Sequence, residues 1–455
     1  MEKFSYYLEI LNSYVWGAPL LILLVVVGLY LTISLKGLQI RHLVYAHKLA
    51  FFSRDDNTEG DISHFQSLMT ALAATIGIGS IAGVATAIAS GGLGSLFWMW
   101  IAAFFGMATK YSEAILAVKY RSIDQNGQMS GGPMYYLEKG LGSKSLAIIF
   151  AALGSITALG TGNMVQSNSV AEAVSELFSI QPLYTGLFLL VITGIPLIWG
   201  IKSISKIASI LVPSMALFYI LGGLLIIFLR LDQVPAAIKL IFSTAFSGQA
   251  ASGGFLGASV MYAIQMGVSR GIFSSEAGLG SSPIAAAAAK TDSPGRQALV
   301  SMCSVFITTG VVCTITGLVI AITGVLGEFA PNGQVLDGSA LALRAFDKVL
   351  PGGGLIVTIA LIPFAYSTIL GWAYYGEKCV EYLFGMKIVP YYRMLYAVLV
   401  IPGAILNLKI VWGLANLMNG LMAFPNLIGL FLLAPVVIKE TKLFEKLLKE
   451  EKIYQ

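Results

Sequence analysis

The sequence predicts an all-α membrane protein with about 11 transmembrane helices. Of its 455 residues, 57% are hydrophobic and only 11% are charged, whereas a soluble globular domain carries about 25% charged residues. A transmembrane helix needs about 20 apolar residues, and this chain holds more apolar sequence than a soluble core could bury. The 49 glycines indicate closely packed membrane helices. Composition therefore argues against a soluble enzyme.

Apolar runs bounded by charged residues or by Gly and Pro predict the individual spans. The first run lacks the features of a cleaved signal peptide, so we expect it to be a retained helix. The eleven predicted spans are 17–35, 66–89, 95–117, 146–174, 183–201, 207–229, 255–289, 297–325, 354–376, 391–406 and 411–437.

Lys and Arg are distributed unevenly over the predicted loops. Alternating the loops between the two sides places 19 of them on one side and six on the other. Because cytoplasmic loops carry the excess of positive charge, we expect an N-terminus outside, a cytoplasmic C-terminus and an odd number of spans. The tail, 438–455, has an amphipathic, mixed-charge helical pattern. It is expected to lie on the membrane surface or to form a solvated terminal helix.

Glycine clusters interrupt two of the spans. The second span contains the stretch 75–83 (TIGIGSIAG), and the seventh contains 267–280 (GVSRGIFSSEAGLG). Such clusters weaken a helix and free backbone groups that lipid cannot satisfy. These stretches are therefore expected to be broken helices that line a cavity or a binding site. The alternative is a pair of intact helices whose glycines only allow close packing.

The positions of the two interruptions predict an inverted repeat. Once the extra N-terminal helix at 17–35 is set aside, ten spans remain, and each interrupted span begins one set of five. Because five is odd, the second repeat, 255–437, must run upside down relative to the first, 66–229. This is the 5+5 arrangement of inverted-repeat transporters, whose broken helices mark the binding site near the midplane. We expect a single membrane domain.

The chemistry of such breaks suggests what they bind. Freed amides around Gly77 and Ser80 could hold a carboxylate, while carbonyls of the seventh span could hold an ammonium group. Sodium takes oxygen ligands, so nearby hydroxyls are candidates as well. Thr75 and Ser80 on the second span, and Ser367 and Thr368 on the ninth, fit that requirement.

Several polar residues in the spans have two interpretations. Arg270 and Glu276 are ionisable groups in an apolar span, and they could form a gate or a structural ion pair. Gln166 could contact a substrate or bind neighbouring helices together. Lys110 and Glu113, three residues apart, are expected to be a packing or interface pair.

Four motifs resemble the alanine or glycine:cation symporter family, the sodium:alanine symporters. They are AATIGIGSIAGVAT (73–86), GSLFWMWI (94–101), SGGPMYY (130–136) and RGIFSSEAGLGSSPIA (270–285). The match covers nearly the whole chain in the same order. The resemblance implies a leucine-transporter-like fold and the Na⁺- or H⁺-coupled uptake of small amino acids.

The resemblance also implies two sets of site residues. The sodium site would use the carbonyls of Ala73, Ile76 and Phe364 and the hydroxyls of Ser367 and Thr368. The substrate site would use Thr75, Gly77, Gly79, Gln166, Phe273 and Trp372. One departure concerns the sodium candidate Ser80: the family usually reads Gly-Asn-Ile-Ala-Gly, and this chain has Ser80 at the Asn position. A shorter hydroxyl thus replaces a carboxamide oxygen.

Together these features predict a secondary active symporter in the cell membrane. It would import a small neutral amino acid, alanine or glycine, with Na⁺ by alternating access, without a cofactor or a nucleic-acid partner. Scarce midspan carboxylates favour Na⁺ over a proton relay, although H⁺ coupling remains the alternative. A channel would need a continuous polar pore or a ring of charges, which the sequence does not suggest. No convincing catalytic set lies in the spans, so we do not expect an enzyme.

Overall fold

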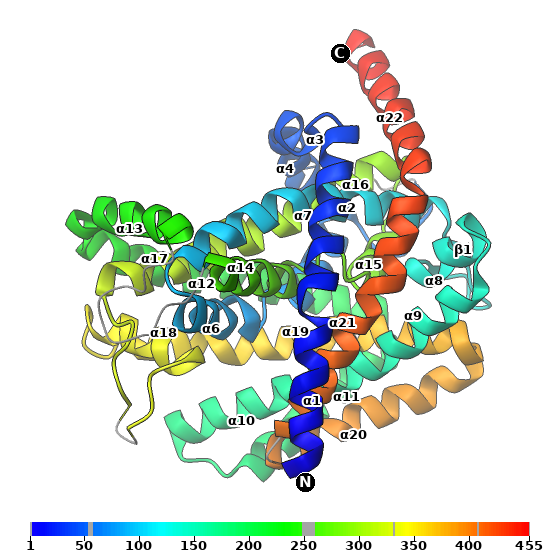
Figure 1. Cartoon of the computed structure of the whole chain (residues 1–455). Helices are drawn as coiled ribbons and strands as arrows, with labels where there is room; N and C mark the ends of the chain where they lie inside the picture. Colours follow the sequence, from blue (N-terminus) through cyan, green and yellow to red (C-terminus); the bar gives the residue numbers. More distant parts are fainter. Residues whose placement is uncertain (1, 53–57, 248–259, 331–332, 407–408, 455) are drawn as a thin grey trace.

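The structure is a computed structural model that describes the whole chain except residues 1, 53–57, 248–259, 331–332, 407–408 and 455. The described chain is a bundle of helices, and its two termini lie at opposite ends of that bundle (Figure 1). Opposite ends agree with an odd number of membrane crossings. The single pair of strands in the described part is an antiparallel hairpin of β1 (Ser122–Ile123) and β2 (Met129–Ser130).

The elements follow the predicted spans closely. In the first half they are α1 (Glu2–Val15), α2 (Ala18–Ser34), α3 (Leu38–Arg41), α4 (Leu43–Phe52), α5 (His64–Thr75), η1 (Ile78–Ser80), α6 (Ala82–Gly91), α7 (Gly94–Lys119), α8 (Pro133–Tyr135), η2 (Tyr136–Gly140), α9 (Lys144–Thr157), η3 (Ala158–Met164), α10 (Val165–Phe178), α11 (Pro182–Trp199) and α12 (Ile201–Leu229). In the second half they are η4 (Leu231–Gln233), α13 (Val234–Ser247), α14 (Val260–Ser275), α15 (Pro283–Ala287), α16 (Pro294–Val305), η5 (Phe306–Cys313), α17 (Thr314–Thr323), α18 (Gly338–Asp347), α19 (Gly354–Phe384), η6 (Met386–Ile388), α20 (Val389–Ile405), α21 (Lys409–Leu432) and α22 (Ala434–Tyr454).

Within the described residues, nine helices are long and apolar enough to cross a membrane, or ten if the bent pair of α5 and η1–α6 counts as one span. The predicted all-α membrane fold is therefore confirmed, but the total of eleven is not. The seventh predicted span is missing from the count because α14 has 16 residues, and residues 255–259 before it lie outside the described chain. The division into two inverted repeats stays a prediction.

The first predicted interruption is confirmed. Helix α5 ends at Thr75, and the next helical segment, which begins at Ile78, is inclined to it by 68°. Gly77 between them has an extended backbone. The carbonyl of Ser80, freed by the break, accepts a hydrogen bond from the Thr316 hydroxyl at 3.1 Å. The break therefore persists in an apolar bundle because side chains replace the lost helical bonds.

The second interruption is shorter than the glycine pattern predicted. Helix α14 continues through Gly267 and Gly271 and ends only at Ser275. These two glycines pack against α7: a Cβ atom at Gly267 would collide with the Ser95 carbonyl, and one at Gly271 would lie 3.3 Å from the Ala102 Cβ. The predicted interruption is therefore confined to the second half of the stretch 267–280, because Gly267 and Gly271 serve close helix contact.

The second break itself occupies residues 276–282, where the backbone turns sharply. Glu276, Gly278 and Gly280 have φ angles of +55°, +88° and +83°. Such angles are strained for a residue with a side chain but are readily adopted by glycine. The break leads into α15, which has only five residues. The second broken span therefore has one long arm and one short arm.

Two buried charges on α7 hold this break in place. The Lys110 ammonium donates to the Ser275 carbonyl at 2.9 Å, and Glu113 Oε1 accepts from the backbone amides of Gly278 and Gly280, both at 3.1 Å. Asn426 on α21 donates to the same carboxylate oxygen at 2.6 Å. The interpretation of Lys110 and Glu113 as a packing or interface pair was therefore incomplete. Both side chains are buried and bind the freed backbone of another span.

The extra N-terminal segment lies along α21 (Figure 1). The Asn12 amide donates to the Gly413 carbonyl at 2.8 Å, and the Trp16 indole donates to the Asn416 carbonyl at 2.9 Å. These bonds anchor α1 to the last predicted span. The extra helix predicted at 17–35 thus continues α1, and together they form one apolar helix from Tyr6 to Ser34.

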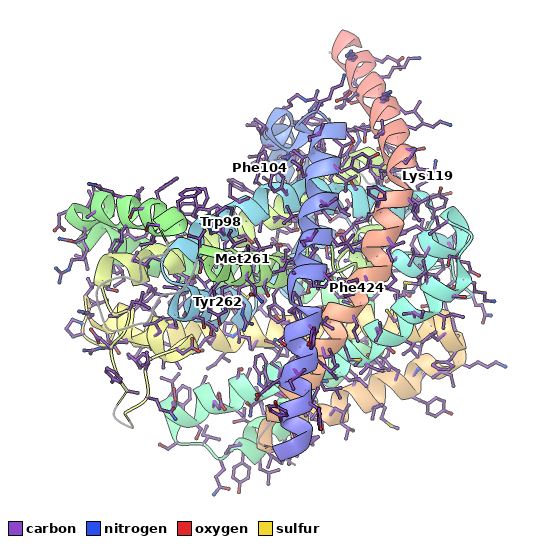
Figure 2. The ribbon with its side chains drawn as sticks, viewed as in Figure 1. Trp98, Phe104, Lys119, Met261, Tyr262 and Phe424 are labelled. Atoms are coloured by element: carbon purple, nitrogen blue, oxygen red, sulfur yellow. The ribbon has the colours of Figure 1, made fainter. Side chains whose placement is uncertain are left out.

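The C-terminal tail is helical, as predicted, but one side of it packs against the protein. Lys119 of α7 pairs with Glu440, and Arg296 of α16 pairs with Glu451 at 2.5 Å. Phe444 of the tail is buried. Figure 2 shows Lys119 beside α22. The tail is therefore a docked part of the domain, which neither predicted alternative described.

The two broken spans are joined near the same end of the bundle as the tail. Residues Ile62 and Ala289, before α5 and after α15, form a parallel bridge. The Ser67 hydroxyl donates to the Ala285 carbonyl at 3.1 Å, and the Arg121 guanidinium donates to the carbonyls of Ala287 and Ala289. These contacts close this end, which the charge distribution predicts to be cytoplasmic.

Replacing Glu113 with Ala tests the buried support of the second break. The variant leaves the two backbone amides and the Asn426 amide without their acceptor, and it removes one of the two carboxylates near Lys110, the other being Glu276. We expect it to lose about 3–5 kcal/mol of unfolding free energy, as when a buried charge loses its partner. Denaturant unfolding of the detergent-solubilised protein measures the loss.

Glu328→Ala is the matched control for Glu113→Ala. Glu328 also pairs with cations, Arg344 and Lys348 at 2.7 Å, but in an exposed position. Such surface pairs contribute about 0–1 kcal/mol. Equal unfolding curves for Glu113→Ala and the unmodified protein would contradict the proposed role of Glu113.

Candidate functional site

Four oxygen atoms of the predicted sodium site lie together where α5 meets α19. The Ser367 hydroxyl donates to the Ala73 carbonyl at 3.1 Å and to the Phe364 carbonyl at 2.9 Å. The Thr368 hydroxyl donates to the same two carbonyls at 3.1 and 3.0 Å. Ile76, the fifth predicted residue, is buried in the turn that follows Thr75. Neutral oxygens in this arrangement are suitable ligands for a hard cation.

Gly77 of the predicted substrate site lies against this oxygen cluster. A Cβ atom at Gly77 would be 2.5 Å from the Thr368 hydroxyl and 3.6 Å from Gln166 Oε1. Gln166 donates to the Thr161 carbonyl at 3.1 Å, while its own Oε1 is buried without a hydrogen-bond partner in the described chain. The structure therefore brings Gly77, Thr368 and Gln166 together, with an unused acceptor facing the first break.

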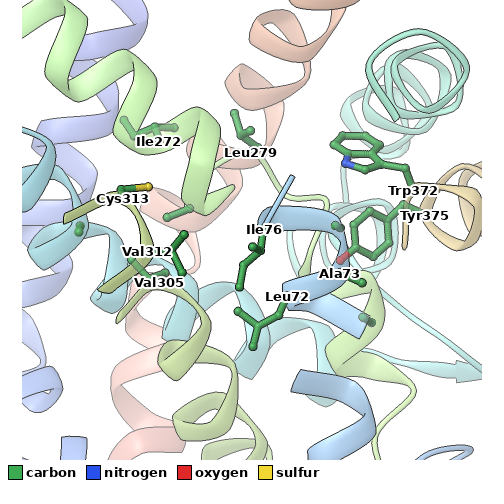
Figure 3. Packing of buried hydrophobic residues seen from close by; sticks show 14 of the residues in the cluster. Leu72, Ala73, Ile76, Ile272, Leu279, Val305, Val312, Cys313, Trp372 and Tyr375 are labelled. Carbon is green, nitrogen blue, oxygen red and sulfur yellow. The ribbon is translucent and has the colours of Figure 1, made fainter. Parts of the chain in front are cut away.

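The aromatic residues of the predicted substrate site flank the same break. The Phe273 ring lies 3.3 Å from the Cβ position of Gly79. Trp372 packs against Gly162, where a side chain would collide with it, and its ring meets Tyr375 edge-on at 5.6 Å. Figure 3 shows Ala73 and Ile76 between Trp372 and Tyr375 on one side and Cys313 on the other.

Thr75 faces a different set of residues from the other predicted substrate contacts. Its hydroxyl donates to the Ala71 carbonyl at 3.0 Å and lies 3.3 Å from the Thr308 hydroxyl. The structure therefore groups the Thr75 side chain with α5 and η5. Gln166 and Trp372 lie with α10 and α19.

Ser80 also lies apart from the Ser367 and Thr368 cluster. Its hydroxyl is 3.1 Å from the Ser274 hydroxyl and 3.5 Å from the Thr75 carbonyl. Ser274 in turn contacts the Cys313 thiol at 3.1 Å. The predicted sodium ligands thus form two polar groups, one on each side of the first break.

Sequence reasoning missed the residues that α14 and η5 supply to the Ser80 group. They are Ser274, Thr308, Thr309 and Cys313, and Thr309 Oγ1 is buried without a partner in the described chain. Segment η5 is a π-helix, a form that often marks functional positions. The pattern of apolar residues does not distinguish a π-helix from an α-helix inside a span. The Ser-Thr content of 301–316 was the only available signal.

Arg270 and Glu276, the predicted gate residues, have different charged neighbours. Arg270 interacts electrostatically with Asp337, which begins α18. Glu276 accepts a hydrogen bond from Ser281 at 2.8 Å, and its carboxylate lies near Lys110 and Trp372. Glu276 is therefore bonded within the second break, whereas Arg270 has a favourable charge interaction with Asp337 but forms no ion pair with it.

The site as a whole consists of neutral oxygen and amide groups between two aromatic walls. Among the described residues there is no group of three or more His, Cys, Asp or Glu side chains that could hold a metal ion. The arrangement is suited to binding a monovalent cation and a small polar molecule next to each other.

Solved structures of membrane transporters share this fold. The transporter MhsT in complex with L-phenylalanine matches with a TM-score of 0.58 and 14% identity, over 85% of this chain and 99% of that chain. A Na⁺-coupled sialic acid symporter in a substrate-bound, outward-open state matches with a TM-score of 0.51 and 16% identity, over 92% and 87%. At such identities the likeness concerns the fold alone, and it confirms the leucine-transporter-like fold.

Sequence comparisons give the family. The sodium/alanine symporter AgcS of Methanococcus maripaludis is 55% identical over 445 residues, 97% of each chain. The amino-acid carrier protein AlsT of Bacillus subtilis is 32% identical over 455 residues, 99% of this chain and 94% of its own length. The model of the sodium:alanine symporter family matches residues 1–455. The chain therefore belongs to the sodium:alanine symporter family of multi-pass membrane transporters, and it is a transporter and not an enzyme.

Proposed function

We propose that this protein imports a small neutral amino acid, alanine or glycine, together with Na⁺ by alternating access across the cell membrane. The observation that carries the proposal is the contact between Gly77 and Thr368 at the first break. It places the candidate ion ligands next to the candidate substrate contacts. Family membership and the 55% identity to a sodium/alanine symporter support Na⁺ and alanine as the pair.

The geometry supplies a physical route for coupling. The carbonyl of Ala73 belongs to the oxygen cluster, and Gly77 lies four residues further along the same backbone, just after the end of α5. A cation on the Ala73, Phe364, Ser367 and Thr368 oxygens would fix the position of this backbone. A substrate carboxylate on the amides after Gly77 would do the same from the other side. Each ligand then raises the affinity for the other, because both favour one arrangement of the break.

The walls of the site support a small substrate. Phe273 is in contact with Gly79, and Trp372 is held against Gly162. Because each ring already lies against a glycine, it cannot shift further in that direction. The site therefore cannot widen to accommodate a substrate with a long side chain. Gln166 Oε1 offers an acceptor for a substrate ammonium group. Alanine and glycine fit these requirements better than leucine does.

Alternating access would open and close the two ends of the broken spans in turn. At the end near the tail, the bridge between Ile62 and Ala289 and the Arg121 bonds hold α5 and α15 together. At the other end, Arg270 of α14 is attracted electrostatically by Asp337, the N-cap residue of α18. We propose that these two sets of contacts exchange during transport, with Arg270 and Glu276 acting as gate residues. In this proposal the tail end, and with it the C-terminus, is cytoplasmic, and the N-terminus lies outside.

Ser80 supports a second position for a cation. Its hydroxyl, the Ser274 hydroxyl and the Thr75 carbonyl are three oxygens close to one another. Because Ser80 is shorter than the Asn usual in the family, this position would bind a cation more weakly than the Ser367 and Thr368 position. We therefore assign the principal coupling ion to the latter.

Equilibrium binding of radiolabelled alanine to the purified protein tests the function. We expect binding in Na⁺ that is lost when K⁺ or choline replaces it. Unlabelled glycine is expected to compete and leucine is not, with D-alanine included to measure stereoselectivity. Binding that is indifferent to Na⁺ but sensitive to pH would move the coupling to H⁺.

Removing one hydroxyl tests the ion position. Thr368→Ala deletes one candidate ligand, and hydrogen bonds to charged groups contribute about 1.5–3 kcal/mol, so the Na⁺ concentration for half-maximal alanine binding should rise about tenfold or more. Thr358→Ala is the control, since this hydroxyl on the same helix bonds only the Gly354 carbonyl. An unchanged Na⁺ dependence in Thr368→Ala would exclude the assignment.

Gly77→Ala tests the contact between the two sites. The added methyl group would lie 2.5 Å from the Thr368 hydroxyl, so both Na⁺ and alanine binding are expected to fall together, at least tenfold. Gly83→Ala serves as the control, because no atom lies within 4 Å of its Cβ position. Loss of alanine binding with unaltered Na⁺ binding, measured with ²²Na⁺, would show that the two sites are independent.

A further inference from the structure

A cavity of about 580 Å³ lies at the end of the bundle that carries the tail, far from the first break. It is formed by α3 and α4, the start of α16 and the last turns of α22. Its polar lining includes four cations, Arg41, Lys48, Arg296 and Lys449. Leu49, Phe52 and Leu448 form its apolar part. The transport proposal assigns no role to this cavity.

The cations of the cavity outnumber its carboxylates. Arg41 pairs with Glu445 at 3.0 Å, and Arg296 pairs with Asp292 and Glu451. These pairs hold α22 in place. They leave the exposed ammonium groups of two other lining residues, Lys48 and Lys449, without an ion pair among the described residues. The cavity therefore carries positive charge that the described residues do not neutralise.

The outer face of α4 beside the cavity has the properties of a membrane-interface helix. Val44 is 86% exposed and Phe52 is 80% exposed, and Ile40 lies four residues before Val44. Val44 and Phe52 are eight residues apart on α4 and so lie on one face of it, while Ile40 belongs to the preceding helix α3. Lys48 occupies the same face between Val44 and Phe52. Exposed apolar side chains with an interspersed lysine are typical of helices that lie at the boundary of headgroups and acyl chains.

We propose that this cavity binds the phosphate headgroup of an anionic membrane phospholipid, with Lys48 and Lys449 as its ligands. The phosphate would complete the charge balance of the cavity and join α4 to the docked tail. Phe52 in the cavity is continuous with the apolar face of α4. This continuity assigns the phosphate to a lipid, because the acyl chains of a lipid can pack on an apolar surface and a free phosphate ion cannot. The cytoplasmic leaflet, where the charge distribution places this end, is rich in anionic lipid.

Lipid binding to the purified full-length protein in detergent tests the proposal. Native mass spectrometry would compare phosphatidylglycerol with phosphatidylcholine of the same acyl chains. A phosphate-lysine contact near the membrane is worth about fivefold in affinity, so Lys48→Gln with Lys449→Gln should weaken phosphatidylglycerol binding about 25-fold. Lys387→Gln, at an exposed lysine outside the cavity, is the control and should bind like the unmodified protein.

Two further measurements keep the outcome decisive. The pair Lys48→Arg and Lys449→Arg retains the charge and should retain the preference for phosphatidylglycerol, and Na⁺-dependent alanine binding reports that each variant is folded. Equal binding of the two lipids, or full binding by the double Gln variant, would overturn the proposal. Thermal stabilisation by inorganic phosphate alone, equal to that by phosphatidylglycerol, would overturn the lipid assignment as well.

Discussion

The structure depends on one requirement: backbone groups freed in the middle of a membrane bundle need partners from the protein itself, because lipid offers none. At the second break this requirement explains two buried charges. Glu113 accepts from two backbone amides, and Lys110 donates to a backbone carbonyl. At the first break, hydroxyls of α17 and α19 do the same for the carbonyls of Ser80 and Ala73. Broken helices are thus stable here because neighbouring helices supply the hydrogen-bond donors and acceptors that the missing helical turns would have supplied.

Because freed backbone groups need hydrogen-bond partners, the candidate binding groups are gathered at the two breaks. A carbonyl that is free of its helix can accept from a hydroxyl or coordinate a cation, and an amide that is free can bind a carboxylate. The polar residues that stabilise the breaks are therefore also the residues with suitable chemistry for an ion and an amino acid. In the proposed function, the same atoms support the breaks and bind the ligands, and the contact between Thr368 and Gly77 joins the two proposed sites.

Composition and the spacing of apolar runs were sufficient to predict the membrane fold and the first break, since long apolar segments have few alternatives. The resemblance to a family assigned Ala73, Ile76, Phe364, Ser367 and Thr368 to one site, and four of them, up to 295 residues apart, lie together through the hydrogen bonds of Ser367 and Thr368. The second break was predicted too broadly, because a glycine that allows helix packing and a glycine that adopts a positive φ angle cannot be told apart in the sequence. The roles of Glu113 and of the docked tail depend on contacts between distant segments, which one-dimensional patterns do not encode.

The hydrogen bonds within the oxygen cluster have a consequence for the transport cycle. Each hydroxyl has one proton and lies within hydrogen-bond distance of both carbonyls, so the two hydroxyls can satisfy the two carbonyls without any ligand from outside. A symporter must return to its starting state without cargo, and that return would be slow if unpaired carbonyls faced an apolar bundle. Self-pairing lowers this barrier, and it also means that an arriving cation has to displace internal bonds. If the cluster holds the coupling ion as proposed, its internal bonds lower the affinity for that ion and speed the return of the unloaded carrier.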